Sequence, residues 1–363
     1  MIFVLALALT IWFAGRAAGF PAQARWLALG LLYIAVLFVQ VALPAGNPLR
    51  EITGREPALW LLIGGLAAVV YGYRALLMRV KAQAGPGVET EAPRPETFSE
   101  SELERYARHI VLRELGGPGQ KRMRDARVLV IGAGGLGSPA LLYLAGAGMG
   151  TIGVIDDDIV SNANLQRQVI HRDRDIGMPK VFSAERAMKE LNPYITVRPY
   201  NRRLSEEIIA DLLDDYDLVL DGTDNFETRH LVNRACVAKG LPLISGALSQ
   251  WEGQISVFDP ARGAPCYACV FPTIPEPGLA PSCAEAGVFG PLPGVVGAMM
   301  AAEAVKLVSG AGTPMRGQML IYDALEGETR RIAVQRRGAC TVCGGAAVSR
   351  FSPIGHAELP SVD

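Results

Sequence analysis

The 363-residue sequence predicts an α/β fold class, with a Rossmann-like, mainly parallel sheet covered by helices on both faces and preceded by two or three transmembrane helices. Three observations support this prediction. Strand-like and helix-like segments alternate after residue 98, a glycine-rich loop follows the first of these strands, and long uncharged apolar runs lie before residue 80. The formal net charge of −1 gives no reason to expect binding to nucleic acid.

Residues 1–80 form the predicted transmembrane region, because charged side chains are sparse there. The uncharged runs 26–43 and 57–73 have the length of a bilayer crossing, and the second resumes after Arg74. We expect spans at about 1–15, 26–43 and 57–78. The first is the weakest, and it lacks the positive n-region of a signal peptide. The alternative is a buried hydrophobic hairpin in a soluble protein.

Residues 81–99 are expected to form a flexible linker, because they are rich in proline, glycine, alanine and glutamate and cannot bury a core. The soluble domain is predicted over residues 100–345. A polar tail, 346–363, follows it.

Within the soluble domain, the expected elements follow one another in βα order. Runs of β-branched residues predict strands, and apolar residues three and four apart predict helices, with Ser205 as one N-cap. The predicted parallel strands are 127–131, 151–155, 195–197, 217–220 and 243–245, and the helices between them are 138–147, 181–191, 205–213 and 226–239. An antiparallel edge strand at 253–258, a helix at 295–309 and a hairpin of 318–323 with 328–334 complete the domain.

The glycine-rich loop contains Gly132, Gly134, Gly135 and Gly137, between a predicted strand and a predicted helix. Glycine lets the backbone approach a phosphate, and the N–H groups at a helix N-terminus attract the anion. Asp156 ends the next strand, where it can accept hydrogen bonds from ribose hydroxyls. These features predict an adenine nucleotide and fit NAD as well as ATP. A merely tight strand–helix turn is the alternative.

Arg167 and Lys180 favour ATP over NAD. A dehydrogenase only holds the pyrophosphate, whereas cleavage of a phosphoanhydride needs cations where negative charge develops. Asp224, with Asn225 beside it, follows the fourth parallel strand in the crevice where ligands bind in such sheets, and its carboxylate suits Mg²⁺. Each residue alone can be a surface ion pair or a helix cap, but together with the glycine loop they indicate an ATP site.

Two C-x-x-C pairs, Cys266 with Cys269 and Cys340 with Cys343, account for four of the six cysteines. Four thiolates on two tight turns suit a structural Zn²⁺ in a zinc knuckle. Redox pairs or disulfides are the alternative, which a cytoplasmic ATP enzyme disfavours. Cys236 is expected in the core.

These segments together resemble the ThiF/MoeB/HesA family of ubiquitin-activating-like adenylyltransferases, and most closely the molybdopterin-synthase adenylyltransferase (MoeB) type. The resemblance rests on RYARHI (105–110), the glycine loop, SNANLQRQVIH (161–171), GMPK (177–180), DGTDN (221–225), CAEAGVFGP (283–291) and the two cysteine pairs. The motifs occur in the family's order. The membrane region lies outside the resemblance and departs from the usual soluble member.

The resemblance implies a role for each matching residue. The nucleotide-binding residues would be Gly132, Gly134, Gly135, Gly137, Asp156, Asn164, Arg167, Lys180, Asp224 and Asn225. Asn164, Arg167 and Lys180 would contact phosphates, and Asp224 would coordinate Mg²⁺. Arg108 matches an arginine that reaches into the partner subunit's site, which implies a homodimer. The catalytic residues would thus be Arg167, Lys180, Asp224 and Arg108.

The implied reaction is attack on the α-phosphate of ATP by the C-terminal glycine carboxylate of a small ubiquitin-like sulfur carrier ending in Gly-Gly. Pyrophosphate leaves, and the acyl-adenylate then accepts sulfur for molybdopterin (molybdenum cofactor) biosynthesis. No general base is needed, because the nucleophile is already a carboxylate. Cys283 lies where some family members form a covalent sulfur link with the carrier. Because only a short tail follows Cys343, we expect a separate sulfur donor, a desulfurase or rhodanese.

Three other functions remain open. The same chemistry can serve a carrier of the thiamine pathway. A membrane-tethered NAD(P)-dependent oxidoreductase would share the nucleotide fold, although nothing after Asn225 resembles a hydride-transfer site. A non-catalytic membrane scaffold is the third, and the intact Arg167, Lys180 and Asp224 argue against it.

The expected location is the bacterial inner (plasma) membrane, with the catalytic domain in the cytoplasm, where ATP and sulfur carriers occur. The positive residues agree with this orientation: Arg16, Arg25, Arg74, Arg79 and Lys81 would lie inside, and Arg50 and Arg55 outside. The loop 44–56 would then face outward. This distribution predicts the side on which the enzyme lies, but it does not distinguish two spans from three.

Overall fold

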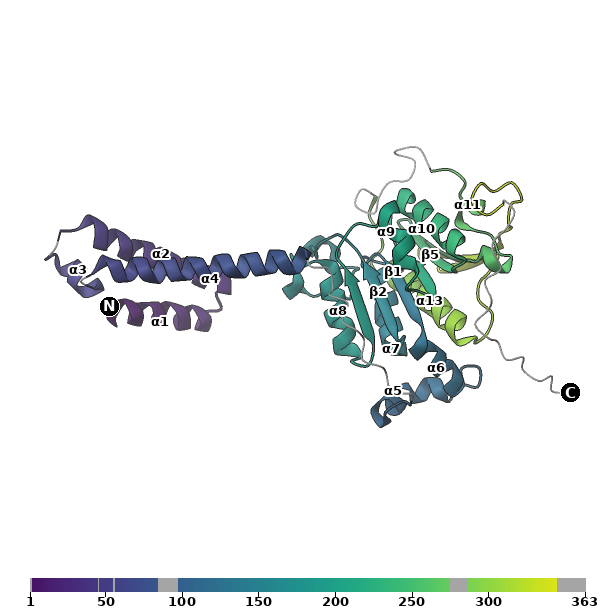
Figure 1. The fold of residues 1–363 in the computed structure, drawn as a ribbon, viewed down its shortest axis with the longest axis horizontal. Helices are drawn as coiled ribbons and strands as arrows, with labels where there is room; N and C mark the ends of the chain where they lie inside the picture. Colours follow the sequence, from purple (N-terminus) through teal and green to yellow (C-terminus); the bar gives the residue numbers. More distant parts are fainter. Residues whose placement is uncertain (1, 45, 55, 84–96, 275–285, 345–363) are drawn as a thin grey trace. The chain divides into compact units, whose positions relative to one another are not determined.

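The computed structural model describes residues 2–44, 46–54, 56–83, 97–274 and 286–344. The chain divides into two compact units, residues 1–84 and 85–363. The described helices of the N-terminal unit are α1 (Ile2–Ala17), α2 (Ala22–Ala42), α3 (Pro48–Thr53) and α4 (Pro57–Gln83) (Figure 1). Helix α3 falls within the predicted outer loop, and α4 continues through Gln83, into the stretch predicted as linker.

The N-terminal unit exposes most of its apolar side chains. Val4, Val36 and Trp60 form a small buried cluster, whereas residues such as Phe38 and Leu62 are each 70% exposed. By length and apolar composition, Ala24–Ala42 and Pro57–Arg74 can cross a membrane, and the apolar helix Phe3–Ala17 is shorter. An exposed apolar surface of this kind is what a lipid-facing helix presents.

The C-terminal unit contains an eight-stranded sheet in its described residues, in the order β3-β2-β1-β4-β5-β6-β7-β8. The strands are β1 (Arg127–Ile131), β2 (Thr151–Ile155), β3 (Thr196–Tyr200), β4 (Leu218–Asp221), β5 (Leu243–Leu248), β6 (Glu252–Phe258), β7 (Gln318–Asp323) and β8 (Glu328–Ala333). Strands β1 to β5 are parallel, and the pairs from β5 to β8 are antiparallel. The predicted mainly parallel sheet is therefore confirmed.

One strand prediction is wrong in its position. Strand β6 is antiparallel, as expected, but it is not an edge strand, because β7 pairs with its second side, for example Ser256 with Met319. The edge is β8, all of whose residues are exposed. The alternation in residues 253–258 indicates a strand, but it carries no information on which later segment returns to pair with it.

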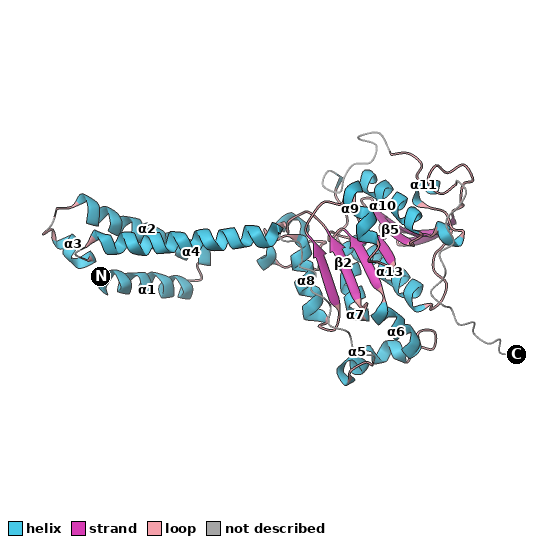
Figure 2. Cartoon of the chain, viewed as in Figure 1, coloured by secondary structure: helices cyan, strands magenta, loops and turns pink. Residues whose placement is uncertain are grey.

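Helices cover both faces of the sheet (Figure 2). The helices of this unit are α5 (Glu100–Ile110), α6 (Gly116–Asp125), α7 (Gly137–Ala147), α8 (Lys180–Leu191), α9 (Glu206–Leu213), α10 (Phe226–Lys239), α11 (Tyr267–Val270) and α13 (Pro291–Ser309). Helices α7, α8 and α13 contribute to one buried core, and α9 and α10 contribute to another. Successive residues of β1 alternate between them: Val128 and Val130 belong to the first, and Leu129 and Ile131 to the second.

Helix α13 is also long and apolar enough to meet the length and composition expected of a membrane span. Half of its residues are buried inside the fold, and Val296 and Met300 belong to the core that it shares with α7. Core packing thus accounts for its composition.

In the parallel half of the sheet, the carboxyl ends of all strands lie at one edge, which is where a ligand site is expected.

Candidate active site

A pocket of about 630 Å³ opens at the carboxyl ends of the parallel strands. The sequence-predicted residues that line it are Gly132, Gly134, Gly135, Asp156, Arg167, Lys180, Asp224 and Asn225. Asn164 lies beside this pocket, because its Oδ1 accepts a hydrogen bond from Nη2 of Arg167 at 3.1 Å. Gly137 is buried at the start of α7, and Arg108 is exposed on α5. In the described part of the chain, these three residues are not among those that line the pocket.

Glycine is required at several points of the loop between β1 and α7. Gly132 has a φ of +93°, in the left-handed region that side chains disfavour. A Cβ at Gly137 would overlap the carbonyl oxygen of Gly132, and one at Gly135 would come within 3.1 Å of Pro293. The N-cap, Leu136, makes no side-chain hydrogen bond among the described residues. The cap residue therefore does not compete with an anion for the first N–H groups of α7.

Asp156 connects this loop to the end of β2 through hydrogen bonds. Its Oδ2 accepts from the backbone N–H of Ala133 at 2.8 Å, and its Oδ1 accepts from the N–H of Asp158 at 2.8 Å. Each carboxylate oxygen has a further lone pair. Asp156 can therefore hold the loop and still accept a hydroxyl hydrogen from a ligand.

Lys180 is buried at the start of α8, with 4% of its surface exposed. Its Nζ lies 2.7 Å from Oδ2 of Asp158, whose side chain is 68% exposed. A buried ammonium needs an anionic partner, because an unpaired charge in the interior is costly. Asp158 is a pocket residue that the sequence interpretation missed, although it is the third member of the acidic run that begins with Asp156.

The turn after β4 presents Asp224 to the pocket. Asp221 is fully buried, and its Oδ1 accepts from the N–H of Thr223 at 3.0 Å and from its hydroxyl at 2.7 Å. Asn225 caps α10 by accepting from the N–H of Thr228 at 2.8 Å. Asp224 itself stays exposed. The DGTDN sequence thus combines a side-chain-stabilised turn with a helix cap.

A buried arginine on α10 stabilises this turn through hydrogen bonds to its backbone. Arg229 is 5% exposed, and its Nη2 donates to the carbonyls of Thr223 and, at 2.8 Å, of Gly246. Its Nη1 donates to the hydroxyl of Ser245 at 3.0 Å. Sequence reasoning missed Arg229, since a single arginine within a predicted helix gives no sign that it turns inward. Arg202 and Arg203, which follow β3 after one intervening residue, also line the pocket and were missed.

Comparison with known proteins decides the family. Residues 106–342 match the ThiF family. The chain belongs to the ThiF family. It is 48% identical over 257 residues to the sulfur carrier protein adenylyltransferase of Thermus thermophilus, a match that covers 70% of this chain and 95% of that protein. It is 44% identical over 247 residues to the molybdopterin-synthase adenylyltransferase of Escherichia coli, covering 68% and 98%.

A crystal structure of E. coli MccB with MccA-N7isoASN shares the fold of this ThiF-family chain. Its TM-score is 0.59 at 23% identity, and the match covers 69% of this chain and 77% of that chain. The ThiF match over residues 106–342 confirms the predicted family, and the likeness to MccB agrees with the Rossmann-like sheet.

The donor set of the pocket suits the cation predicted for this ThiF-family chain. Mg²⁺ prefers carboxylate oxygens and water. Asp224 offers an exposed carboxylate, and Asp156, Asp157 and Asp158 have oxygens within 4.8 Å of one another. Asp224 remains our predicted ligand, and the acidic run at the end of β2 supplies further oxygens on the same pocket wall.

Cys266, Cys269, Cys340 and Cys343 converge in a buried cluster. In the described structure, none of the four is among the residues that line the pocket, although Tyr267, which follows Cys266, is. Sγ of Cys266 lies 3.6 Å from Sγ of Cys340, and that of Cys269 lies 3.4 Å from that of Cys343. Thiolates about 2.3 Å from a tetrahedral Zn²⁺ are separated by about 3.8 Å. The four sulfurs therefore fit Zn²⁺, and their separations are too long for disulfide bonds.

Backbone and side-chain donors surround this cysteine cluster. The N–H of Arg337 lies 3.4 Å from Sγ of Cys269. Burial raises the pKa of Cys266. Burial also raises the pKa of Cys340, but hydrogen bonds from the N–H groups of Cys343 and Val342 outweigh this effect and lower that pKa to about 7. Such donors favour thiolate, which is the form that binds a metal.

The two other cysteines have different settings. Cys236 is buried on α10, and its burial raises the pKa of its thiol, in keeping with the core position expected for it. Cys283, the predicted sulfur-transfer residue, lies outside the described residues.

Proposed function

We propose that this chain is an ATP-dependent adenylyltransferase that activates the C-terminal glycine of a small ubiquitin-like sulfur carrier for molybdopterin biosynthesis. The observation that carries the proposal is the convergence of Arg167, Lys180 and Asp224 on one pocket with the glycine loop. The names of the relatives, adenylyltransferases of a sulfur carrier and of molybdopterin synthase, support the same chemistry.

ATP would bind with its phosphates over the glycine loop and the start of α7, and with its ribose at Asp156. Lys180 would then exchange its ion pair with Asp158 for a phosphate oxygen, so that the buried ammonium keeps an anionic partner throughout. Arg167, oriented by Asn164, would contact the phosphates from the loop after β2.

In the reaction, one oxygen of the glycine carboxylate forms a bond to the α-phosphorus, and the bond from that phosphorus to the pyrophosphate oxygen breaks. No proton has to be removed from the nucleophile. The protein therefore contributes alignment and positive charge, from Arg167, Lys180 and the partner subunit's arginine described below. Mg²⁺, held at Asp224, supplies further neutralisation of phosphate charge when bound.

Arg108 supports a homodimer in this proposal. It is exposed on α5, and it is not among the residues that line the pocket of its own chain in the described structure. It would complete the site of the second subunit. The sulfur would come from a separate desulfurase or rhodanese, and the apolar helices α2 and α4 would hold the enzyme at the membrane.

The test is ATP–pyrophosphate exchange by the full-length protein with Mg²⁺ and purified carriers ending in Gly-Gly. We expect exchange to fall by about a hundredfold or more in Lys180→Ala and in Asp224→Ala, the scale seen when a charge-stabilising group is removed. Lys189→Ala, an exposed lysine on the same helix as Lys180, serves as the control. Near-normal exchange in both site variants would refute the assignment.

The choice of carrier is tested in the same assay. A molybdopterin-type and a thiamine-type carrier are compared at equal concentration, and we expect exchange with the former to be faster. The reverse order would move the enzyme to the thiamine pathway without changing its chemistry. Oxidation of NADH without pyrophosphate release would instead favour an oxidoreductase.

A further inference from the structure

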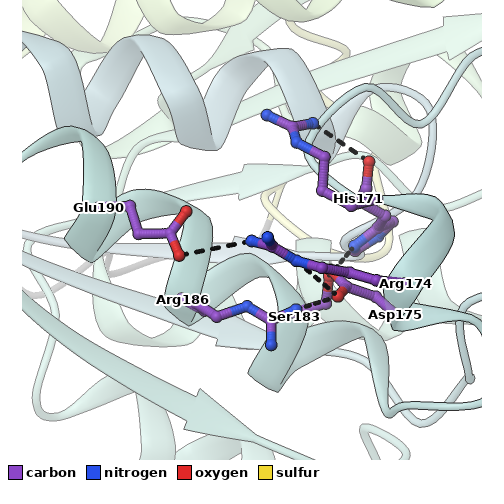
Figure 3. A network of polar contacts seen from close by, with 7 residues as sticks. His171, Arg174, Asp175, Ser183, Arg186 and Glu190 are labelled. Atoms are coloured by element: carbon purple, nitrogen blue, oxygen red, sulfur yellow. Dashed lines mark hydrogen bonds and ion pairs between the residues drawn. The ribbon is translucent and has the colours of Figure 1, made fainter. Parts of the chain in front are cut away.

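A buried chain of hydrogen bonds lies beneath the glycine loop. His171, 4% exposed, has its Nε2 at 2.9 Å from the carbonyl oxygen of Ala133 and its Nδ1 at 2.9 Å from Oγ of Ser183. Oγ of Ser183 in turn lies 2.7 Å from Oδ2 of Asp175 (Figure 3). The predicted reaction makes no use of these side chains, and His171 matches no metal or triad spacing.

The three contacts require three hydrogens. A carbonyl oxygen only accepts, so Nε2 of His171 must carry a hydrogen. An ionised carboxylate also only accepts, so the hydroxyl hydrogen of Ser183 must point to Asp175. Nδ1 of His171 must then donate to Oγ of Ser183. A neutral imidazole and one hydroxyl supply only two hydrogens, and the chain of contacts therefore holds one more.

The surroundings of Asp175 place this third hydrogen on the histidine. Arg186 forms an ion pair with the carboxylate, and Nε of Arg174 lies 3.8 Å from its Oδ1. Burial raises the pKa of Asp175, but the hydrogen bonds from Ser183 and Arg186 outweigh it and hold that pKa below its usual value. The carboxylate is therefore ionised, and a neutral Asp175 that donates to Ser183 is disfavoured.

The groups that face His171 act in opposite directions on its charge. Burial and the charge of Lys180 lower the pKa of His171, and they outweigh the carbonyl of Ala133 and the carboxylates of Asp156 and Asp175, which raise it. Against this net downward shift stands the count of hydrogens that the three contacts require. A neutral ring would leave one of the three contacts, at 2.7 to 2.9 Å, without a hydrogen between its two atoms. Such an arrangement costs a buried hydrogen bond.

We propose that His171 is a positioning residue for the nucleotide site and acts as an imidazolium held between Ala133 and the Ser183–Asp175 pair. The role of His171 follows from its hydrogen bond to Ala133 in the glycine loop. The carbonyl of Ala133 is bound by His171, and the N–H of Ala133 is bound by Asp156 at 2.8 Å. Both sides of this residue are thereby fixed, which orients the glycine loop toward the pocket and adds a buried positive charge beneath the phosphates.

The protonation state is tested without any substrate. The full-length protein is labelled with ¹⁵N-histidine, and the ring nitrogens are recorded at pH 7.5; with four histidines in the chain, His171→Gln assigns the signal. We expect two protonated nitrogens for His171. Ser183→Ala removes the link to Asp175 and should leave one protonated nitrogen. Ser138→Ala, a matched buried serine whose Oγ lies 3.4 Å from the same carbonyl, should leave the imidazolium intact. A neutral ring in the unchanged protein would overturn the proposal.

The positioning role rests on the proposed function and is tested by direct ATP binding, which needs no carrier. We expect Ser183→Ala and His171→Gln to weaken ATP binding by about tenfold, the lower end of the range for groups that orient binding residues. As the pH rises through the pKa of His171, the ATP affinity of the unchanged protein should fall, whereas that of Ser183→Ala should not fall with it, because its histidine is already neutral. The deficit of Ser183→Ala relative to the unchanged protein should therefore shrink at high pH. Unaltered ATP affinity in Ser183→Ala, with thermal unfolding unchanged, would refute the role. If the unchanged protein binds no ATP, the proposed function fails, whereas the nitrogen spectra still decide the protonation of His171.

Discussion

At the scale of single residues, the site depends on side chains that act through the backbone as well as on those that meet the nucleotide. Asp156 and His171 hold the two polar groups of Ala133, and Arg229 holds the carbonyls of Thr223 and Gly246. Through these backbone contacts, the three side chains hold in place the two loops that form the pocket. A small displacement of a reacting group is enough to slow a reaction that depends on alignment.

Arg229 offers a direct test of this arrangement. Arg229→Met keeps much of the buried volume but releases the turn that presents Asp224, so we expect ATP–pyrophosphate exchange to fall by about tenfold to a hundredfold. Arg234→Met on the same helix removes a 50%-exposed side chain that pairs with Glu206, and it should leave exchange unchanged. Equal rates for both variants, measured at saturating ATP, would show that the turn does not need this anchor.

At the scale of elements, the cysteine cluster joins two distant segments of the chain. Helix α11 carries one C-x-x-C pair, and the segment after β8 carries the other. The four buried sulfurs would fill all the positions of a tetrahedral site, so bound Zn²⁺ would serve stability rather than catalysis. Metal binding would fasten the segment after the edge strand to the body of the domain.

We therefore expect about one Zn²⁺ per chain, and Cys266→Ser should lose the metal and lower the melting temperature. Cys236→Ala, a buried cysteine outside the cluster, is the matched control and should retain the metal. Elemental analysis and thermal unfolding of the freshly purified protein measure both effects. Protein free of zinc, with all four thiols intact and the usual stability, would contradict the assignment.

At the scale of the whole molecule, the dimer is testable by mixing two inactive variants. Arg108→Ala and Lys180→Ala should each lose about a hundredfold in exchange. If Arg108 serves the partner's site, a mixed dimer contains one intact site, so co-expression in equal amounts should restore about one quarter of the normal rate. Absence of any recovery, with mixed dimers demonstrated by affinity tags, would place Arg108 in its own subunit's site.

The membrane topology is a second question at this scale. We predict that a reporter active only in the cytoplasm will work when fused after Asp363, and that one inserted near Asn47, in the loop between α2 and α4, will report the periplasm. The reason is the excess of arginine and lysine on the inner side. A cytoplasmic signal from the loop would overturn the orientation. Fusion at Ala18, directly after α1, distinguishes two spans from three when compared with a fusion at the N-terminus.

Local sequence patterns determined most of the secondary structure and the chemistry of the pocket. Helix α10 and strand β7 begin and end at the predicted residues, because caps, glycines and apolar periodicity act within a few residues of the chain. The predicted glycine loop, Arg167, Lys180 and Asp224 all line the pocket, since parallel strands bring their carboxyl ends to one edge.

Only the tertiary structure decided which distant groups complete these features. It placed β6 inside the sheet rather than at its edge, paired Lys180 with Asp158, turned Arg229 inward behind the active-site turn, and linked His171 to Asp175 through Ser183. In each case, the residues next to these groups in the sequence do not indicate which distant group will be the partner. The choice among partners follows from burial, because a buried charge or donor must find its partner wherever the packed elements bring one within reach.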